Sequence, residues 1–358
     1  MKKKLLVCRI LALAVAGFAI WSGYKVLSQP ERKPLTTPAP QHPQPATYLD
    51  GSQFTIGVNY PRGPNCGFGA NSWGHYGPSA PECSAKIETD FAQLEALDVR
   101  VIRWWLFADF RSGLKLDQKS NVIGVDDYVF PDIDNAVRIA DKHNIKIIFV
   151  LSDFMLFDKP QMASGVQMFG RRDLIVNPIK RQQLLDNVYK PVFERYGHNS
   201  AIIAWDVINE PEWAMYVHTG EWIVHDRINH RIMQAYVTET VDYIHRYTEQ
   251  WATVGSAKRG LLRFWRHCNL DVYQFHYYYK MERQYRLDYP AAKLKLDRPV
   301  FVGEFPSANG HRSVDEYLTI IRRNGYAGAF PWSMNASDPY TSAPEIMRGI
   351  TQFHGAKP

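Results

Sequence analysis

The sequence predicts one (β/α)8 barrel, an α/β fold, preceded by an N-terminal export segment and a proline-rich linker. Eight short apolar runs have the character of strands, and stretches with helical periodicity follow most of them. These runs are continuously apolar rather than alternating, which is typical of parallel strands covered on both faces. Eight such units in about 300 residues match a (β/α)8 barrel. A doubly wound open sheet is the alternative, but no G-x-G-x-x-G follows the first run.

The elements are expected in regular order along the chain. We expect strands at 54–60, 99–107, 145–152, 201–208, 252–256, 271–278, 299–305 and 327–333. We expect helices at 86–97, 131–143, 178–196, 222–250, 314–324 and 344–353. The helix at 131–143 has a proline at its start, where the missing N–H is harmless. The helical pattern is weakest near 261–266 and in the stretch that ends at 296.

The basic charge of the chain belongs to its N-terminus. The 358 residues carry a formal charge of +6, from 42 basic and 36 acidic groups. Residues 1–50 hold seven of the basic groups and two of the acidic ones, so residues 51–358 have a net charge of only +1. A nearly neutral domain argues against a nucleic-acid partner. Aromatic residues make up 13% of the chain, which suits flat apolar ligands such as sugar rings.

The first fifty residues predict export. A basic cluster at Lys2–Lys4 precedes an apolar stretch, so residues 1–28 are expected to be a signal peptide or a signal anchor. An anchor would tether the protein to a membrane through residues 5–27. Residues 29–50 are rich in proline and form an extended linker before the domain at 51–358. We expect a monomer at the periplasmic or extracellular face of the membrane, anchored or secreted.

Cysteine usage agrees with export. Cys66 and Cys83 flank a loop rich in Gly, Pro and Asn, and an exported protein permits a disulfide between them. Cys268 has no obvious partner and is expected to be a buried thiol. No Cys/His spacing resembles a zinc site, so we predict neither a metal nor another cofactor.

Two glutamates stand at the ends of predicted strands. Glu210 follows the run AIIAWDVIN, and Glu304 ends the run PVFVG. A carboxylate at the end of such a run is costly unless function requires it. Barrel enzymes place their chemistry at the carboxyl ends of their strands, and two carboxyl groups there can act as an acid/base pair or as an acid and a nucleophile.

The motif Asn209-Glu210-Pro211 after a fourth strand, with Glu304 ending a seventh, resembles clan A of the retaining glycoside hydrolases. The resemblance covers residues 54–353 and is closest to family 5, the cellulase and mannanase family. It implies that Glu210 is the general acid/base and Glu304 the nucleophile. Asn209 would hydrogen-bond the sugar 2-hydroxyl. Arg103, in the second strand, would orient Glu304 and lower its pKa through its opposite charge.

The resemblance also covers the last strands. The His-x-Tyr pattern of the sixth strand matches His276 and Tyr278, which would support the acid/base and lie beside the nucleophile. Because tyrosines flank Tyr278 on both sides, that choice depends on the spacing alone. Trp332 matches the tryptophan beneath the sugar, after which a cis peptide is common in the family.

One position departs from the family pattern. Family 5 proteins usually carry a histidine at the end of the third strand, where this chain has none and Asp153 lies nearest. Either Asp153 takes part of that role, or the chain belongs to a neighbouring clan A family. Glu212 and Trp213 directly follow the motif and are candidates for sugar contact.

The predicted reaction is double displacement with retention, acting inside a β-linked polysaccharide or oligosaccharide of the glucan or mannan type. We expect the two carboxyl groups about 5–5.5 Å apart. The pKa of Glu210 should be raised and that of Glu304 lowered. Two alternatives remain open, namely a transglycosylase that uses the same residues and a non-catalytic glycan-binding or assembly accessory protein.

Overall fold

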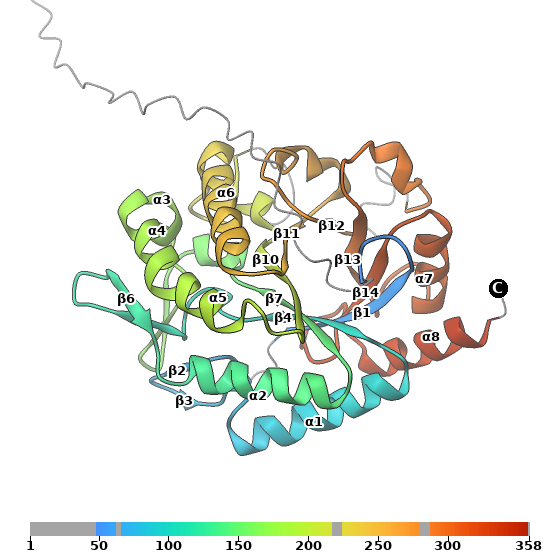
Figure 1. Ribbon diagram of the computed structural model, residues 1–358, viewed down its shortest axis with the longest axis horizontal. Coiled ribbons are helices and arrows are strands. Elements are labelled where there is room, and N and C mark those ends of the chain that lie inside the picture. The colour runs from blue at the N-terminus through green and yellow to red at the C-terminus, as the bar shows by residue number, and fades with distance from the viewer. Residues whose placement is uncertain (1–47, 62–65, 217–223, 279–286, 357–358) are drawn as a thin grey trace, which may run out of the picture. The chain divides into compact units, whose positions relative to one another are not determined.

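A computed structural model describes residues 48–61, 66–216, 224–278 and 287–356 (Figure 1). The predicted signal or anchor segment 1–28, and the linker up to residue 47, lie outside the described residues. Export, the tether through residues 5–27 and the boundaries at 28 and 50 therefore stay predictions. In the part of the chain that the structure describes, no helix combines the length and the apolar character needed to cross a bilayer.

The predicted barrel is confirmed. Eight parallel strands close on themselves in the order β1-β4-β7-β10-β11-β12-β13-β14. Their bounds are β1 Thr55–Tyr60, β4 Val101–Trp105, β7 Lys146–Val150, β10 Ile202–Asn209, β11 Trp251–Ser256, β12 Tyr273–His276, β13 Val300–Pro306 and β14 Gly328–Trp332. All eight predicted strands are present, so the open-sheet alternative is wrong. The barrel is closed because β1 pairs with β14 on one side and with β4 on the other.

Helices surround this barrel (Figure 1). Their bounds are α1 Pro81–Ala96, α2 Val129–Lys142, α3 Asp173–Val176, α4 Pro178–Leu184, α5 Lys190–Tyr196, α6 His230–Tyr247, α7 Val314–Arg323 and α8 Ala343–Gly355. The helix expected at 178–196 is divided by a π-helical turn at Leu185–Tyr189. Where the structure describes the two weakest helical patterns, outside residues 279–286, it shows the 3₁₀ turns η4 at Arg259–Phe264 and η6 at Ala291–Leu294.

Three antiparallel hairpins extend the loops after neighbouring barrel strands. They were not expected from the sequence, because each strand has at most four residues. Their bounds are β2 Ala70–Asn71 with β3 Gly74–His75, β5 Leu114–Leu116 with β6 Val122–Val125, and β8 Gln161–Ala163 with β9 Val166–Met168. Trp73 and Ser72 join the first hairpin to the third, since they donate hydrogen bonds to carbonyl oxygens of Ala163 and Gly165.

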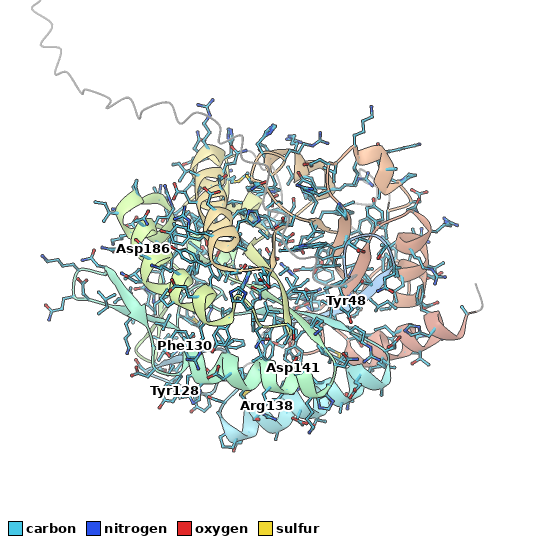
Figure 2. All side chains as sticks on the ribbon, viewed as in Figure 1. Tyr48, Tyr128, Phe130, Arg138, Asp141 and Asp186 are labelled. Carbon is cyan, nitrogen blue, oxygen red and sulfur yellow. A yellow bond between two sulfur atoms is a disulfide. The ribbon has the colours of Figure 1, made fainter. Side chains whose placement is uncertain are left out.

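Apolar side chains fill one layer of the barrel interior. Other side chains pack the space between the sheet and the helices (Figure 2). The ring of Phe330 fits in this layer because β1 carries Gly57, where a Cβ atom would lie 2.4 Å from that ring. The buried members of the layer are Leu49, Val101, Ile148, Ile203, Ala204, Trp251, Val272, Ala327, Phe301 and Phe330.

A polar layer lies one step further along the strands. Alternate strand residues point to the same side, so Val101 is followed by Arg103 and Val272 by Gln274. The strand register pairs Asn59 of β1 with Arg103 of β4. This alternation changes the barrel interior from apolar to polar towards the carboxyl ends of the strands, where the predicted site residues lie.

The predicted disulfide is present between Cys66 and Cys83. It ties the loop after β1 to the first turn of α1, since Cys83 lies two residues after the start of that helix. Cys268 is a buried free thiol, as expected.

Removing this disulfide should lower stability without changing the barrel. The two cysteines are 17 residues apart, and a loop of that length predicts a loss of about 3 kcal/mol in the free energy of unfolding for the Cys66→Ala/Cys83→Ala variant. Chemical denaturation measures this change. As a control, a reducing agent should destabilise the wild type and leave the double variant unaffected. Equal unfolding midpoints for the two proteins would contradict the prediction.

Candidate active site

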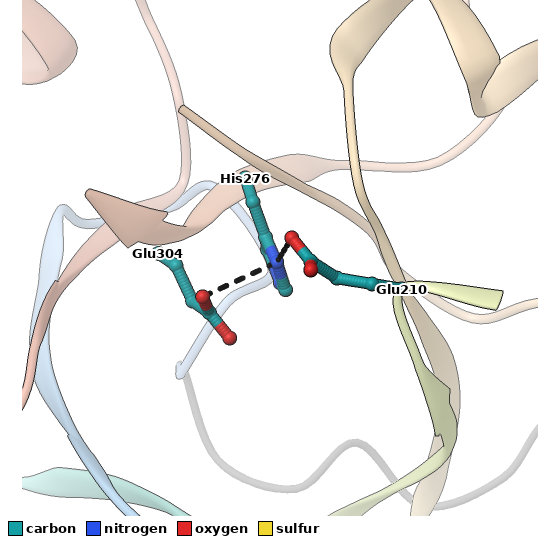
Figure 3. A group of neighbouring side chains, drawn as sticks. All are labelled: Glu210, His276 and Glu304. Carbon is teal, nitrogen blue, oxygen red and sulfur yellow. Dashed lines mark hydrogen bonds and ion pairs between the residues drawn. The ribbon is translucent and has the colours of Figure 1, made fainter. Parts of the chain in front are cut away.

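The predicted site residues converge on one rim of the barrel. Parallel strands of a closed barrel all end at the same rim, so side chains at their carboxyl ends meet there. Figure 3 shows three of them, Glu210, His276 and Glu304. The other predicted site residues come from five strands or strand ends: Arg103 in β4, Asp153 after β7, Asn209 at the end of β10, Tyr278 after β12 and Trp332 at the end of β14.

Arg103 is fully buried at the centre of this group. Its Nε donates to Asp206 Oδ2 at 2.8 Å, and its Nη2 donates to Asn209 Oδ1 at 2.7 Å. Its Nη1 donates to Glu304 Oε1 at 2.8 Å and to Asn59 Oδ1 at 3.1 Å. Burial alone would lower the pKa of Arg103, but the two carboxylates raise it, so the guanidinium stays charged.

Glu304 is held on both carboxyl oxygens. Its Oε1 accepts from Arg103, and its Oε2 accepts from the Tyr278 hydroxyl at 2.8 Å. The side chain is only 5% exposed. Burial raises the pKa of this carboxyl, although His276 and Arg103 act in the opposite direction. The expectation of a lowered pKa for Glu304 is therefore wrong, because loss of hydration outweighs the neighbouring positive charge.

Glu210 has different surroundings. Its backbone adopts a left-handed conformation with φ of 46°, unusual for a non-glycine residue, and its N–H donates to the Gly255 carbonyl at 2.6 Å. Trp213 Nε1 donates to its Oε2 at 2.8 Å. Burial raises the pKa of Glu210 to about 8, partly offset by the Trp213 hydrogen bond. The predicted increase is thus confirmed.

His276 lies between the two glutamates (Figure 3). Its Nδ1 is 2.8 Å from Glu210 Oε1 and 3.4 Å from Glu304 Oε2. Burial lowers the pKa of this imidazole to about 4, so the ring is neutral near pH 7. One donor atom from each of the three residues lies within 4.8 Å of the others. Such a group could hold a metal ion, a type of site that the sequence did not predict.

One carboxyl oxygen of Glu210 and one of Glu304 lie close to each other. Inverting enzymes keep their carboxyl groups about 6.5–9.5 Å apart to admit a water molecule, and retaining enzymes keep them at about 5–5.5 Å. The oxygens of Glu210 and Glu304 that face each other lie within 4.8 Å. An oxygen pair this close is compatible with the shorter of these two separations, and retention stays a prediction.

Asp153 joins this network through Asn209. Its Oδ2 accepts from Asn209 Nδ2 at 2.9 Å and from Trp105 Nε1 at 3.0 Å. Since Asn209 Oδ1 already accepts from Arg103, the orientation of the Asn209 side-chain amide is fixed at its oxygen and at its nitrogen. Burial raises the pKa of Asp153, partly offset by the hydrogen bonds that it accepts.

Trp332 borders the site with a partly exposed ring. Its Nε1 donates to Asp338 Oδ2 at 2.7 Å, and its ring meets Trp105 edge to face at 5.4 Å between centroids. The peptide between Trp332 and Ser333 is cis, as the resemblance implied. The Trp332 ring is therefore oriented by polar and aromatic contacts before any ligand binds.

The two residues after the Asn-Glu-Pro motif have different environments. Trp213 is 7% exposed and reaches Glu210 with its indole N–H. Glu212 is fully buried, and its carboxylate accepts from Ser256, Ala257 and Trp265. Glu212 therefore hydrogen-bonds the end of β11 and the segment after it, and the expectation that Glu212 contacts the sugar is wrong.

Three polar residues of the site were missed in the sequence. Asn59 and Asp206 both accept hydrogen bonds from Arg103, and Gln274 Nε2 donates to Asp206 Oδ2 at 2.7 Å. Each is a polar residue inside an otherwise apolar strand. Each either lies on the same face of its strand as a site residue or pairs in register with one. That alternation was visible in the sequence and could have identified them.

No known family model matches the chain. A mannan endo-1,4-beta-mannosidase from Mytilus edulis is 21% identical over 291 residues, 69% of this chain and 76% of the relative. One from Cryptopygus antarcticus is 20% identical over 368 residues, 87% of this chain and 90% of the relative.

Solved structures agree with these relatives. The Mytilus edulis beta-mannanase matches with a TM-score of 0.72 at 20% identity, covering 85% of this chain and 92% of that one. A glycoside hydrolase family 5 mannosidase from Rhizomucor miehei matches with a TM-score of 0.54 at 14% identity, covering 84% and 94%. With the sequence relatives, they bear out the predicted resemblance to the family 5 glycoside hydrolases of clan A, and the solved structures share the barrel fold of this chain.

Proposed function

We propose that the protein is an endo-acting hydrolase of a β-1,4-linked mannan that cleaves its substrate with retention of configuration. The observation that carries this proposal is the pair Glu210 and Glu304, one half-buried and one buried carboxyl group at close spacing with different partners. The names of both sequence relatives support mannan rather than glucan as the substrate.

Glu304 is the proposed nucleophile. Attack on the anomeric carbon requires an ionised carboxylate in a fixed orientation. Arg103 and Tyr278 each donate to one of its oxygens, which favours the charged form and limits rotation of the group. The Tyr278 bond can weaken as the carboxylate becomes an ester and loses its charge.

Glu210 is the proposed acid and base. With a pKa of about 8 it holds a proton at neutral pH, and that proton passes to the glycosidic oxygen while Glu304 forms the glycosyl ester. Glu210 is then a carboxylate and takes a proton from the water that releases the ester. His276 is neutral and so adds no positive charge that would release the Glu210 proton early.

Asn209 and Asp153 are proposed to bind and position the sugar. With its carbonyl oxygen facing Arg103, the Asn209 amide nitrogen keeps one hydrogen for a sugar hydroxyl after donating the other to Asp153. Asp153, which lies nearest to the position of the missing histidine, orients Asn209 through this hydrogen bond. The partly exposed Trp332 ring offers an apolar surface for the sugar face.

We also propose that the enzyme acts outside the cytoplasm. The Cys66–Cys83 disulfide supports an oxidising compartment. Anchoring through residues 5–27 is the finer part of the proposal, and a secreted form is its alternative. Transglycosylation with the same glutamates is a second candidate reaction, which analysis of products at high oligosaccharide concentration would reveal.

Loss of either glutamate should abolish mannan cleavage. Glu210→Gln should lower kcat on β-1,4-mannan by about 10²–10⁴-fold, because the amide cannot donate a proton to the leaving oxygen, and Glu304→Gln should lower it at least as much. Reducing-end assays on mannan and cellulose measure this. Added azide should rescue Glu304→Ala as an α-glycosyl azide and Glu210→Ala as a β-glycosyl azide. Wild-type activity in either Gln variant would overturn the assignment.

The pH profile of kcat/KM should fall on its basic side near pH 8. Glu210 must be protonated to act as an acid, and its pKa of about 8 means that this form is lost as the pH rises through that value. Initial rates on a soluble mannan between pH 4 and 10 test this. Constant activity from pH 7 to 10 would contradict the prediction.

Gly255→Ala should disable the site although residue 255 touches no substrate. A Cβ atom there would lie 2.6 Å from Arg103 Nη2 and 3.3 Å from Asn209 Oδ1. Displacing the guanidinium by a fraction of an ångström should lower kcat by about 10²-fold. Gly124→Ala is the matched control, since its Cβ would meet no atom within 4 Å. Equal kcat in the two variants would contradict the prediction.

A further inference from the structure

The carboxylate of Asp206 is fully buried inside β10, where a sugar cannot touch it. Its Oδ2 accepts from Arg103 Nε at 2.8 Å and from Gln274 Nε2 at 2.7 Å. Its Oδ1 accepts from the Gly255 N–H at 2.9 Å. Burying a carboxylate is costly even when a positive charge is bonded to it, so the presence of Asp206 calls for a reason beyond packing.

Arg103 divides its positive charge between Asp206 and the proposed nucleophile. Its Nη1 donates to Glu304 Oε1 at 2.8 Å, while its Nε donates to Asp206. Its other two acceptors, on Asn59 and Asn209, are neutral amide oxygens. One buried cation is therefore bonded to two carboxylates, and the three charged groups together carry one excess negative charge.

The proposed reaction changes only one of these three charges. In the first step a carboxylate oxygen of Glu304 bonds to the anomeric carbon, and the bond from that carbon to the glycosidic oxygen breaks as Glu210 protonates the oxygen. Glu304 is then a neutral ester, and Asp206 alone balances Arg103. In the second step a water oxygen bonds to the anomeric carbon, its proton passes to Glu210, and the electron pair of the ester bond returns to Glu304.

We propose that Asp206 is a positioning residue that holds Arg103 and balances its charge in the glycosyl ester, when Glu304 has lost its own charge. This inference rests on the proposed roles of Glu210 and Glu304. Without Asp206, ester formation would leave a buried guanidinium with no counter-charge, which is strongly unfavourable. Asp206 therefore favours the first step. It gives no such help to the second step, which restores the Glu304 carboxylate.

The test measures the two steps separately in Asp206→Asn. Release of dinitrophenol from a dinitrophenyl β-mannobioside, with enzyme in excess, gives the rate of the first step. Recovery of enzyme trapped with a 2-deoxy-2-fluoro-β-mannobiosyl fluoride gives the rate of the second. The first rate should fall by about 10²-fold, and the second should not fall. Equal falls in both rates would overturn the proposal, since a general disturbance of the site would produce them.

Two further variants separate charge from packing. Gln274→Met removes a neutral donor from Asp206 but keeps the carboxylate, so it should slow the first step by less than about tenfold. Asp132→Asn is the matched control: Asp132 is equally buried, lies in α2, and accepts from Gly69 N–H at 2.8 Å and the Ser79 hydroxyl at 2.6 Å. It should lower stability and leave both rates unchanged.

Gln274→Met also decides the matter if Asp206→Asn does not fold. A smaller fall in the first rate supports the role of the charge. A fall of about 10²-fold, with the Asp206 carboxylate still present, would overturn it.

The outcomes separate this inference from the proposed function. A wild type that releases neither sugar from mannan nor dinitrophenol from the aryl glycoside would end the proposed function. An active wild type, with an unchanged first step in Asp206→Asn, would overturn the inference and leave the proposed function intact.

Discussion

The buried guanidinium of Arg103 is the constraint on which the site depends. A charge without hydration is tolerated only if its donors are all matched by acceptors and its charge is balanced. The planar fork of the guanidinium therefore dictates where Asp206, Glu304 and Asn209 can lie. Because Asp206 and Asn209 belong to β10 and Glu304 to β13, the requirement couples strand register to the positions of the proposed reacting groups.

Two carboxyl groups in one buried site differ through their partners. Glu304 is bonded to a cation and a phenol, and Glu210 to an indole N–H and a neutral imidazole nitrogen. Burial raises the pKa of both carboxyl groups and Arg103 lowers the pKa of both, but only Glu304 is hydrogen-bonded to the guanidinium. This division supports the proposal that Glu210 holds the proton and Glu304 the negative charge.

The loops after β1, β4 and β7 contact one another at the rim of the barrel where these strands end. The disulfide holds the first loop, Trp73 bonds it to the third, and Arg111 from the second lies over the Phe169 ring of the third. Asp153 begins the third loop and bonds to Asn209. The contacts among these loops therefore help to fix Asp153, which orients Asn209 in the proposed active site.

The amino-acid sequence alone predicted the barrel, the disulfide and the meeting of Glu210 and Glu304 at the strand ends. Apolar runs separated by helical periods specify parallel strands, and Glu210 and Glu304 are costly at strand ends unless they function there. Only the tertiary structure decided the pKa of Glu304, the contacts of Glu212 and the roles of Asn59, Asp206 and Gln274. These properties depend on burial and on partners far apart in the chain, and neither distance nor hydration can be obtained from local residue patterns.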